Sequence, residues 1–159
     1  MNTSAIEIIP FESKHKQAFY NLNAEWLDTH FYIETYDEMV LRNPETYIID
    51  KGGFIFFVKK ENEIIGTAAF INQNSYYELS KMAISPKYRG FKIGEKLITY
   101  CIDFAKKQHW KSITLYSNRK LIAAIKLYQK MGFTELPLEK DVHYERADIK
   151  MMLELQASV

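Results

Sequence analysis

The sequence predicts a mixed α/β domain, and the order of its segments supplies the evidence. Residues 53–84 contain three β-rich runs separated by short polar breaks, a pattern typical of antiparallel strands. Residues 85–117 then follow as loop, helix and strand, a unit that normally makes a right-handed crossover between parallel strands. We therefore expect a central, mostly antiparallel sheet of six to seven strands, flanked by about four helices.

Length and composition indicate a single domain over residues 1–159, with 47% hydrophobic and 14% aromatic residues. The 21 basic and 20 acidic residues nearly cancel, so no nucleic-acid or membrane-surface partner is expected. No stretch approaches the roughly 20 apolar residues that span a bilayer, and the first residues lack a secretion-signal pattern. These features predict a cytoplasmic protein and are compatible with a homodimer.

Cysteine and histidine usage gives no sign of a metal or a thiol nucleophile. Cys101 is the only cysteine and lies at helical spacing from Leu97 and Phe104, where a small buried residue fits. The histidines show no i,i+4 pairing and have no cysteine partners; they are His15, His30, His109 and His143. We expect no metal.

The N-terminal part should form one strand and two helices. "AIEIIPF" is β-rich, and the following 3.6-residue periodicity predicts a helix with Ser13 as its N-cap and Phe19 and Leu27 on its apolar face. "TYDEMVLRN" predicts a second helix, with Asp37 in its first turn, that ends at Asn43 before a proline.

The C-terminal part should continue the α/β pattern. Apolar residues recur at helical spacing from Phe91 to His109, and "KSITLYS" follows as a strand. A further helix should start near Leu121 and stop with Gly132 at its C′ position, before the strands in "FTELPL" and "RADIKMMLEL".

The loop "SPKYRGFKIGEKL" between the third strand and the crossover helix is rich in glycine and positive charge. Amides at a helix start lack intrahelical partners and lie at the positive end of the helix dipole, so they bind anions. Glycine allows close approach of a phosphate, and the basic residues Lys87, Arg89, Lys92 and Lys96 add charge. The alternative is a solvated basic turn whose glycines serve only its conformation.

Two nucleotide-binding patterns do not fit this loop. The Walker pattern needs four residues between its glycines, whereas Gly90 and Gly94 have three between them and Glu95 follows. The dinucleotide pattern GxGxxG occurs nowhere in the chain. Both mismatches weigh against an ATP-binding or NAD-binding domain.

Three features follow one another along the chain: "ELSKMAISPKYRGFKIGEKL", then Asn118, then "AAIKLYQKMGF". By these features the chain resembles the GNAT superfamily of acetyl-CoA-dependent N-acetyltransferases, most strongly over residues 54–135. The resemblance implies a GNAT-like fold, acetyl-CoA as cosubstrate, and a small-molecule, peptide or protein amine as acceptor. The family loop Gln/Arg-x-x-Gly-x-Gly/Ala is matched by Arg89 and Gly94, but Lys92 stands at its first glycine. Lys92 must then keep φ below zero or accept a strain of roughly 1 kcal/mol or more, and a lysine at this position could contact the phosphates directly.

The resemblance also implies a set of cofactor-binding residues. Met82 and Ile84 would bind the pantetheine arm through their backbone, and the Met82 N–H would hold the thioester oxygen; the alternative is that both are ordinary sheet residues. Asn118 would bind the arm or a nearby water, or else cap a turn. The full set is Met82, Ala83, Ile84, Arg89, Gly90, Phe91, Lys92, Ile93, Gly94, Asn118, Ala124 and Tyr128.

Two residues receive catalytic roles from the same resemblance. Tyr128 matches the tyrosine that protonates the leaving thiolate, with core packing as its alternative. Glu78 lies where many family members carry a glutamate base, with an ordinary solvent-facing strand residue as its alternative.

The acceptor pocket should come from the N-terminal helices, whose aromatic and acidic side chains suit an ammonium. The candidates are Trp26, Tyr32, Glu34 and Tyr36, each of which would otherwise be structural. Tyr144 and Arg146 receive no role. Two other classes of function stay open: a non-catalytic acyl-CoA-binding module with the same loop, and a nucleotide-phosphate binder, which the failed Walker spacing opposes.

Overall fold

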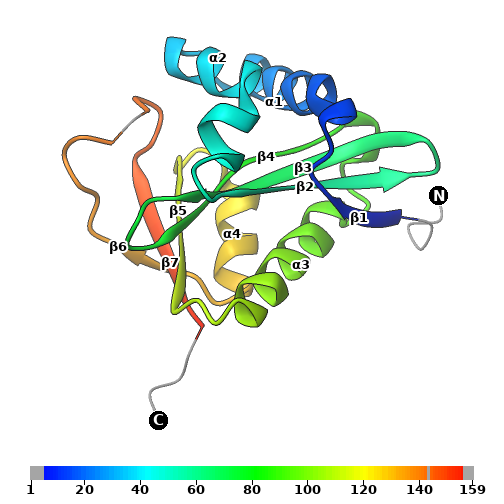
Figure 1. Cartoon of the computed structure of the whole chain (residues 1–159). Helices are drawn as coiled ribbons and strands as arrows, with labels where there is room; N and C mark the ends of the chain where they lie inside the picture. The colour runs from blue at the N-terminus through cyan, green and yellow to red at the C-terminus, as the bar shows by residue number, and fades with distance from the viewer. Residues whose placement is uncertain (1–5, 143, 156–159) are drawn as a thin grey trace.

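The computed structural model describes residues 6–142 and 144–155 and shows a seven-stranded sheet between two helical layers (Figure 1). Ala5, expected in the first strand, and His143 lie outside the described residues. The strand order is β1-β2-β3-β4-β5-β7-β6, and only the β4–β5 pair is parallel. The strands are β1 (Ile6–Pro10), β2 (Phe54–Lys60), β3 (Glu63–Asn72), β4 (Tyr77–Ile84), β5 (Ser112–Ser117), β6 (Thr134–Leu136) and β7 (Ile149–Glu154). The predicted mixed α/β class and the mostly antiparallel sheet are confirmed.

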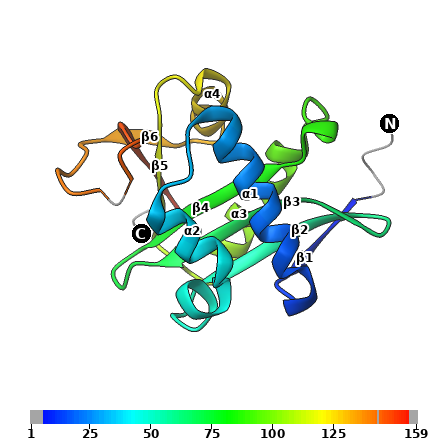
Figure 2. The same ribbon diagram turned by 90° about the horizontal axis from the view of Figure 1, so that it is seen from above.

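Four α-helices cover the two faces of the sheet among the described residues. They are α1 (Lys16–His30), α2 (Thr35–Arg42), α3 (Ile93–Lys107) and α4 (Ile122–Lys130). The first two lie across one face, and the last two lie beneath the other (Figures 1 and 2). The described residues contain no helix long and apolar enough to cross a membrane.

Each face of the sheet has its own hydrophobic core. In β2, Phe56 and Val58 pack toward α3, whereas Ile55 and Phe57 pack toward α1 and α2. Burial on both faces explains why this strand is a continuous apolar run rather than an alternating one. Cys101 is buried in the α3 core, and burial raises the pKa of its thiol to about 12, as suits a packing residue rather than a nucleophile.

Two helix ends were tested by the structure. Ser13 is not the N-cap of α1, because a short 3₁₀ turn, Ser13–His15, precedes that helix and the Ser13 hydroxyl instead donates to Glu45 Oε2 at 3.0 Å. The predicted stop of α4 is confirmed: Gly132 follows its C-cap residue with φ +104°.

The pairing of β4 with β5 is short, and this feature positions the site. The parallel register runs only from Tyr77–Ile113 to Leu79–Leu115. On its other edge, β4 has a register shift against β3, and Lys81 at that shift has φ +53°. A bulge of this kind bends a strand and turns the next side chains to the opposite face. The last residues of β4 therefore leave β5 and open a gap in the sheet.

Candidate active site

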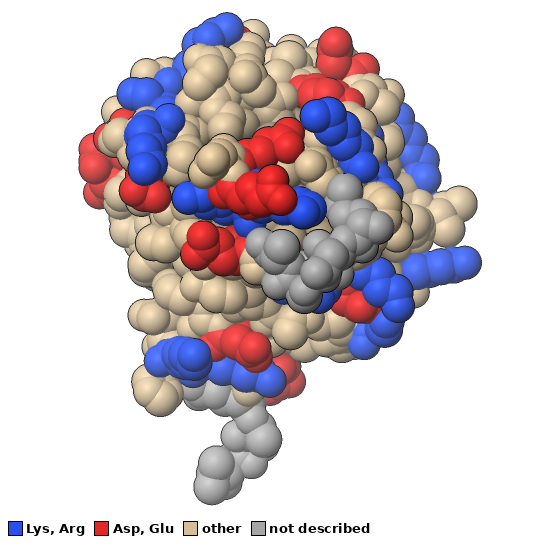
Figure 3. All heavy atoms as spheres, turned by 90° about the vertical axis from the view of Figure 1, so that its right-hand side faces the viewer, with Lys and Arg blue, Asp and Glu red and all other residues tan. Residues whose placement is uncertain are grey.

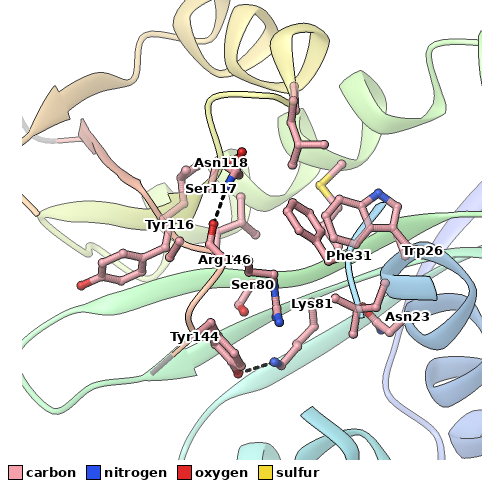
Figure 4. A pocket seen from close by; sticks show the side chains of 18 of the residues that line it. Asn23, Trp26, Phe31, Ser80, Lys81, Tyr116, Ser117, Asn118, Tyr144 and Arg146 are labelled. Carbon is pink, nitrogen blue, oxygen red and sulfur yellow. Dashed lines mark hydrogen bonds between the residues drawn. The ribbon is translucent and has the colours of Figure 1, made fainter. Parts of the chain in front are cut away.

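A cavity of about 250 Å³ lies where β4 and β5 separate (Figure 4). Its walls come from β4, the end of β5, α1, α4 and the segment 144–147. The predicted residues that line it are Trp26, Glu78, Met82, Ala83, Ile84, Arg89, Asn118, Ala124 and Tyr128. The structure thus brings together both predicted catalytic residues and seven of the twelve predicted cofactor residues, counting Tyr128 in both sets. The five loop residues between Gly90 and Gly94 are not part of this lining.

The loop before α3 has the backbone of an anion site. Gly90 has φ +90°, and Lys92 is the N-cap of α3 with φ +61°. Of the two possibilities for Lys92, the structure therefore shows the strained one, at a cost of about 1 kcal/mol. Within the described residues, no backbone N–H from Arg89 to Glu95 donates to another group. These amides are available to a bound oxyanion.

Two of the four basic side chains of this loop already have acidic partners. Arg89 donates to Glu25 Oε1 at 2.7 Å, and Lys87 lies 3.7 Å from Glu63 Oε2. On the face seen in Figure 3, basic and acidic side chains likewise lie beside one another rather than gathering by sign. The charge of Lys87 and Arg89 is therefore partly balanced, and the loop amides with Lys92 and Lys96 are what the loop offers to a phosphate.

Tyr128 projects from α4 to the cavity and also packs on Phe133, with 5.9 Å between ring centroids. The packing alternative is thus confirmed, and the catalytic role of Tyr128 stays a prediction that its place in the lining allows. Burial raises the pKa of its phenol to about 12, so the hydroxyl keeps its proton at neutral pH.

Glu78 is 6% exposed, so the alternative of a solvent-facing strand residue is wrong. Gln73 Nε2 donates to its Oε1 at 2.9 Å. Glu78 also lines a second cavity, of about 240 Å³, which shares Tyr116, Tyr144 and Ala147 with the first. It therefore stands in the wall between the two spaces.

The side chain of Asn118 forms hydrogen bonds with two backbone groups. Its Nδ2 donates to Arg146 O at 2.7 Å (Figure 4), and its Oδ1 accepts from Lys120 N at 2.9 Å. The turn-cap alternative is confirmed for this side chain, and a bond to the cofactor stays a prediction.

Sequence reasoning missed a buried ion network at the α2 side of the cavity. Lys81 Nζ lies 3.5 Å from Asp37 Oδ1, donates to Tyr144 Oη, and lies 4.3 Å from the centroid of that ring. Arg146 donates to both Asp37 oxygens at 2.8 and 2.9 Å and to Glu34 Oε2 at 3.0 Å.

The network shifts the pKa values of its members in different directions. Burial lowers the pKa of Lys81 to about 8, and the attraction of Asp37 offsets only part of that effect. Burial would raise the pKa of Asp37, but the Arg146 hydrogen bonds and the Lys81 charge outweigh it and keep the pKa below its ordinary value. Burial is also the main reason that the pKa of Tyr144 is raised.

One signal in the sequence would have exposed this network. Strict alternation from buried Leu79 would put Lys81 on the α3 core face, where an unpaired lysine is very costly. A lysine at such a position predicts a bulge that turns it to the other face.

Of the four predicted acceptor residues, one lines the cavity. Trp26 lines the cavity, whereas Tyr32 is 56% exposed and donates to Glu145 Oε2 at 2.6 Å. Glu34 accepts a hydrogen bond from Arg146, and Tyr36 packs beside Tyr144 with 5.7 Å between ring centroids. Tyr32, Glu34 and Tyr36 do not line the cavity. Within the described residues there is also no group of three potential metal ligands.

The chain is similar in sequence to several known acetyltransferases. An N-acetylaspartate synthetase from Xenopus tropicalis is 33% identical over 92 residues, covering 56% of this chain and 34% of that protein. A mycothiol acetyltransferase from Renibacterium salmoninarum is 29% identical over 104 residues, covering 62% and 31%. The matches thus span about a third of the length of these curated relatives.

Solved structures match over almost the whole chain. An acetyltransferase of the GNAT family from Staphylococcus aureus Mu50 superposes with a TM-score of 0.84 at 25% identity, covering 96% of this chain and 100% of that one. A spermidine N-acetyltransferase from Vibrio cholerae, in complex with CoA and spermine, has a TM-score of 0.72 at 20% identity, covering 96% and 97%. The model of the Acetyltransferase (GNAT) family matches residues 16–133, which is most of the chain. By this match, the chain belongs to the GNAT acetyltransferase family.

Proposed function

We propose that the protein transfers an acetyl group from acetyl-CoA to a primary amine. The observation that supports this most strongly is the separation of β4 from β5 beyond Leu79–Leu115, which leaves an unpaired strand edge beside a cavity that contains both Glu78 and Tyr128. An extended pantetheine arm can pair with such an edge as a strand would. The free amides from Arg89 to Glu95 then receive the diphosphate.

In the proposed reaction the amine attacks the thioester carbon, a C–N bond forms and the C–S bond breaks. Glu78 takes a proton from the acceptor ammonium so that the free amine can attack, since its buried carboxylate is the only acid among the described residues that line the cavity. The Met82 N–H polarises the thioester carbonyl as a fixed dipole. CoA leaves as a thiolate, which must be stabilised until it gains a proton.

The role of Tyr128 follows from its pKa of about 12. A thiol has an ordinary pKa of about 8.5, so complete proton transfer from this phenol to the thiolate would cost about 5 kcal/mol. A hydrogen bond from the neutral hydroxyl to the departing sulfur carries no such cost. We therefore assign Tyr128 the role of hydrogen-bond donor to the thiolate, with the final proton coming from the amine or solvent.

A thiol-release assay with acetyl-CoA tests the proposal. Amino acids, alkyl amines, polyamines and short peptides are supplied in turn, and release of free CoA is followed with a thiol reagent. We expect release that depends on one class of amine. CoA binding without release for every class would instead indicate a non-catalytic acyl-CoA-binding module.

A further inference from the structure

The acceptor end of the cavity contains a buried lysine whose charge is only partly balanced. The Lys81 side chain is 4% exposed and lies in the cavity wall (Figure 4). An ammonium has three N–H donors, and among the described residues Lys81 uses them on Asp37 and Tyr144. One donor is left for a group inside the cavity.

The acid that pairs with Lys81 is mostly committed to another cation. Arg146 occupies both oxygens of Asp37 at 2.8 and 2.9 Å, whereas Lys81 approaches Asp37 Oδ1 only to 3.5 Å. Glu34 also pairs with Arg146. The charge of Arg146 is therefore balanced by two carboxylates. Lys81 has only a long contact with one of these, Asp37, which it shares with Arg146.

The charges lining the cavity do not suit an acceptor with several positive charges. The lining contains three cations, Lys81, Arg89 and Arg146, and one acid, Glu78. Arg89 and Arg146 are balanced by acids outside the lining, namely Glu25, Glu34 and Asp37. Lys81 is then the cation of the lining whose charge is least balanced and that can attract a negative group, while Glu78 supplies the carboxylate of the lining.

Resting on the acetyltransferase activity proposed above, we propose that Lys81 determines acceptor specificity by binding a carboxylate, and that the acceptor is an amino acid or another amine with a carboxylate close to its amino group. The Lys81 ammonium binds the carboxylate while the amine lies toward Glu78. The Coulomb attraction between a cation and an anion is larger in a buried site than on the surface, and here it would offset part of the desolvation cost that the Lys81 ammonium already bears.

Matched acceptors test this directly. The panel consists of amino acids, the same amino acids as neutral amides, the corresponding amines without the carboxylate, and spermidine. For the wild-type protein we expect kcat/KM to be at least about 10-fold higher for the best amino acid than for its matched amide or amine. In Lys81→Met this ratio should fall toward one, mainly through a higher KM for the amino acid. Lys126→Met, an exposed lysine on α4, is the control and should leave the ratio unchanged.

The outcomes separate this proposal from the activity on which it rests. Thiol release that prefers amides, amines or spermidine, or a Lys81→Met variant that loses activity equally for both members of a pair, would overturn the role of Lys81 and keep the acetyltransferase activity. Unchanged CoA affinity in Lys81→Met shows that the variant is folded.

A second readout does not depend on turnover. The pKa of Lys81, followed by NMR of its side chain, should rise from about 8 when the preferred amino acid is added, and the matched amide should leave it unchanged. The groups that face Lys81 are Asp37 from α2, Glu78 from β4, and Tyr144 and Arg146 from the C-terminal segment. A pKa unchanged by every amino acid in the panel overturns the proposal, even where no acceptor turns over.

Discussion

Replacing Lys81 by methionine should change how the stability of the protein depends on pH. Folding disfavours the charged form of this lysine, because its pKa falls from the ordinary value of 10.5 to about 8. Below about pH 8 the lysine is protonated in both the folded and the unfolded chain, so the full penalty is present. Between about pH 8 and 10.5 the folded protein has lost the proton and the unfolded chain has kept it, so the penalty is relieved as pH rises.

The size of the effect follows from the shift. A difference of about 2.5 pH units corresponds to about 3 kcal/mol at 1.36 kcal/mol per unit. The free energy of unfolding of the wild type, relative to Lys81→Met, should therefore rise by up to about 3 kcal/mol between pH 7 and pH 10.5. Titrating groups that do not interact with Lys81 cancel in this difference, and Asp37, whose pKa the Arg146 hydrogen bonds and the Lys81 charge keep below its ordinary value of 3.8, titrates below this pH range.

Urea unfolding followed by tryptophan fluorescence at several pH values measures this difference. Lys126→Met supplies the matched control, and its difference from wild type should not change with pH. A Lys81→Met difference that stays constant, or that falls as pH rises, would refute the description of Lys81 as a buried and poorly balanced cation.

Three further substitutions test the site. Tyr128→Phe should lower turnover by roughly 10²-fold with CoA affinity unchanged, as expected when one hydrogen-bond donor to a developing negative charge is lost, and unchanged turnover would remove Tyr128 from the mechanism. Glu78→Gln should lower turnover, and the deficit should shrink as pH rises because more of the acceptor is then free amine; a deficit independent of pH would argue against a base. Lys92→Gly should raise the free energy of unfolding by up to about 1 kcal/mol, because it removes a side chain from a left-handed conformation, and should weaken CoA binding several-fold if the lysine contacts phosphate. The control is Glu61→Gly in the β2–β3 turn, where φ is +55°; it should raise the free energy of unfolding by a similar amount and leave CoA affinity unchanged. If the Lys92→Gly variant binds CoA as tightly as this control does, Lys92 does not contact the phosphates.

The sequence predicted the order of elements well because that order depends on local periodicity. The alternation and turn signals of residues 53–84 predict three strands, and the helical spacing after Phe91 predicts α3. The glycine-rich loop therefore lies between the end of β4 and the start of α3. Glu78 and Tyr128, which line the cavity at the β4–β5 separation, were predicted by the resemblance to the GNAT family and not by periodicity.

The features that the sequence did not predict depend on contacts distant in sequence or on local irregularity. Asp37 does lie in the first turn of α2, as predicted, where its Oδ2 accepts from Glu34 N at 3.0 Å; its second pairing, with Arg146 across 109 positions, is one that no local pattern reveals. Simple alternation does not place Lys81 at the site, because a bulge reverses the face of β4 at that residue. Ser13 has the residue type of an N-cap, but the chain makes a 3₁₀ turn there before α1 begins.

The central claim is that the amides before α3 and the unpaired edge of β4 bind coenzyme A. A backbone amide NMR titration with CoA tests it most directly. We predict saturable shifts at one CoA per chain, largest for Arg89–Glu95 and for Met82–Ile84. Shifts confined to other parts of the sheet, or the absence of any saturable shift in well-folded protein, would contradict the assignment.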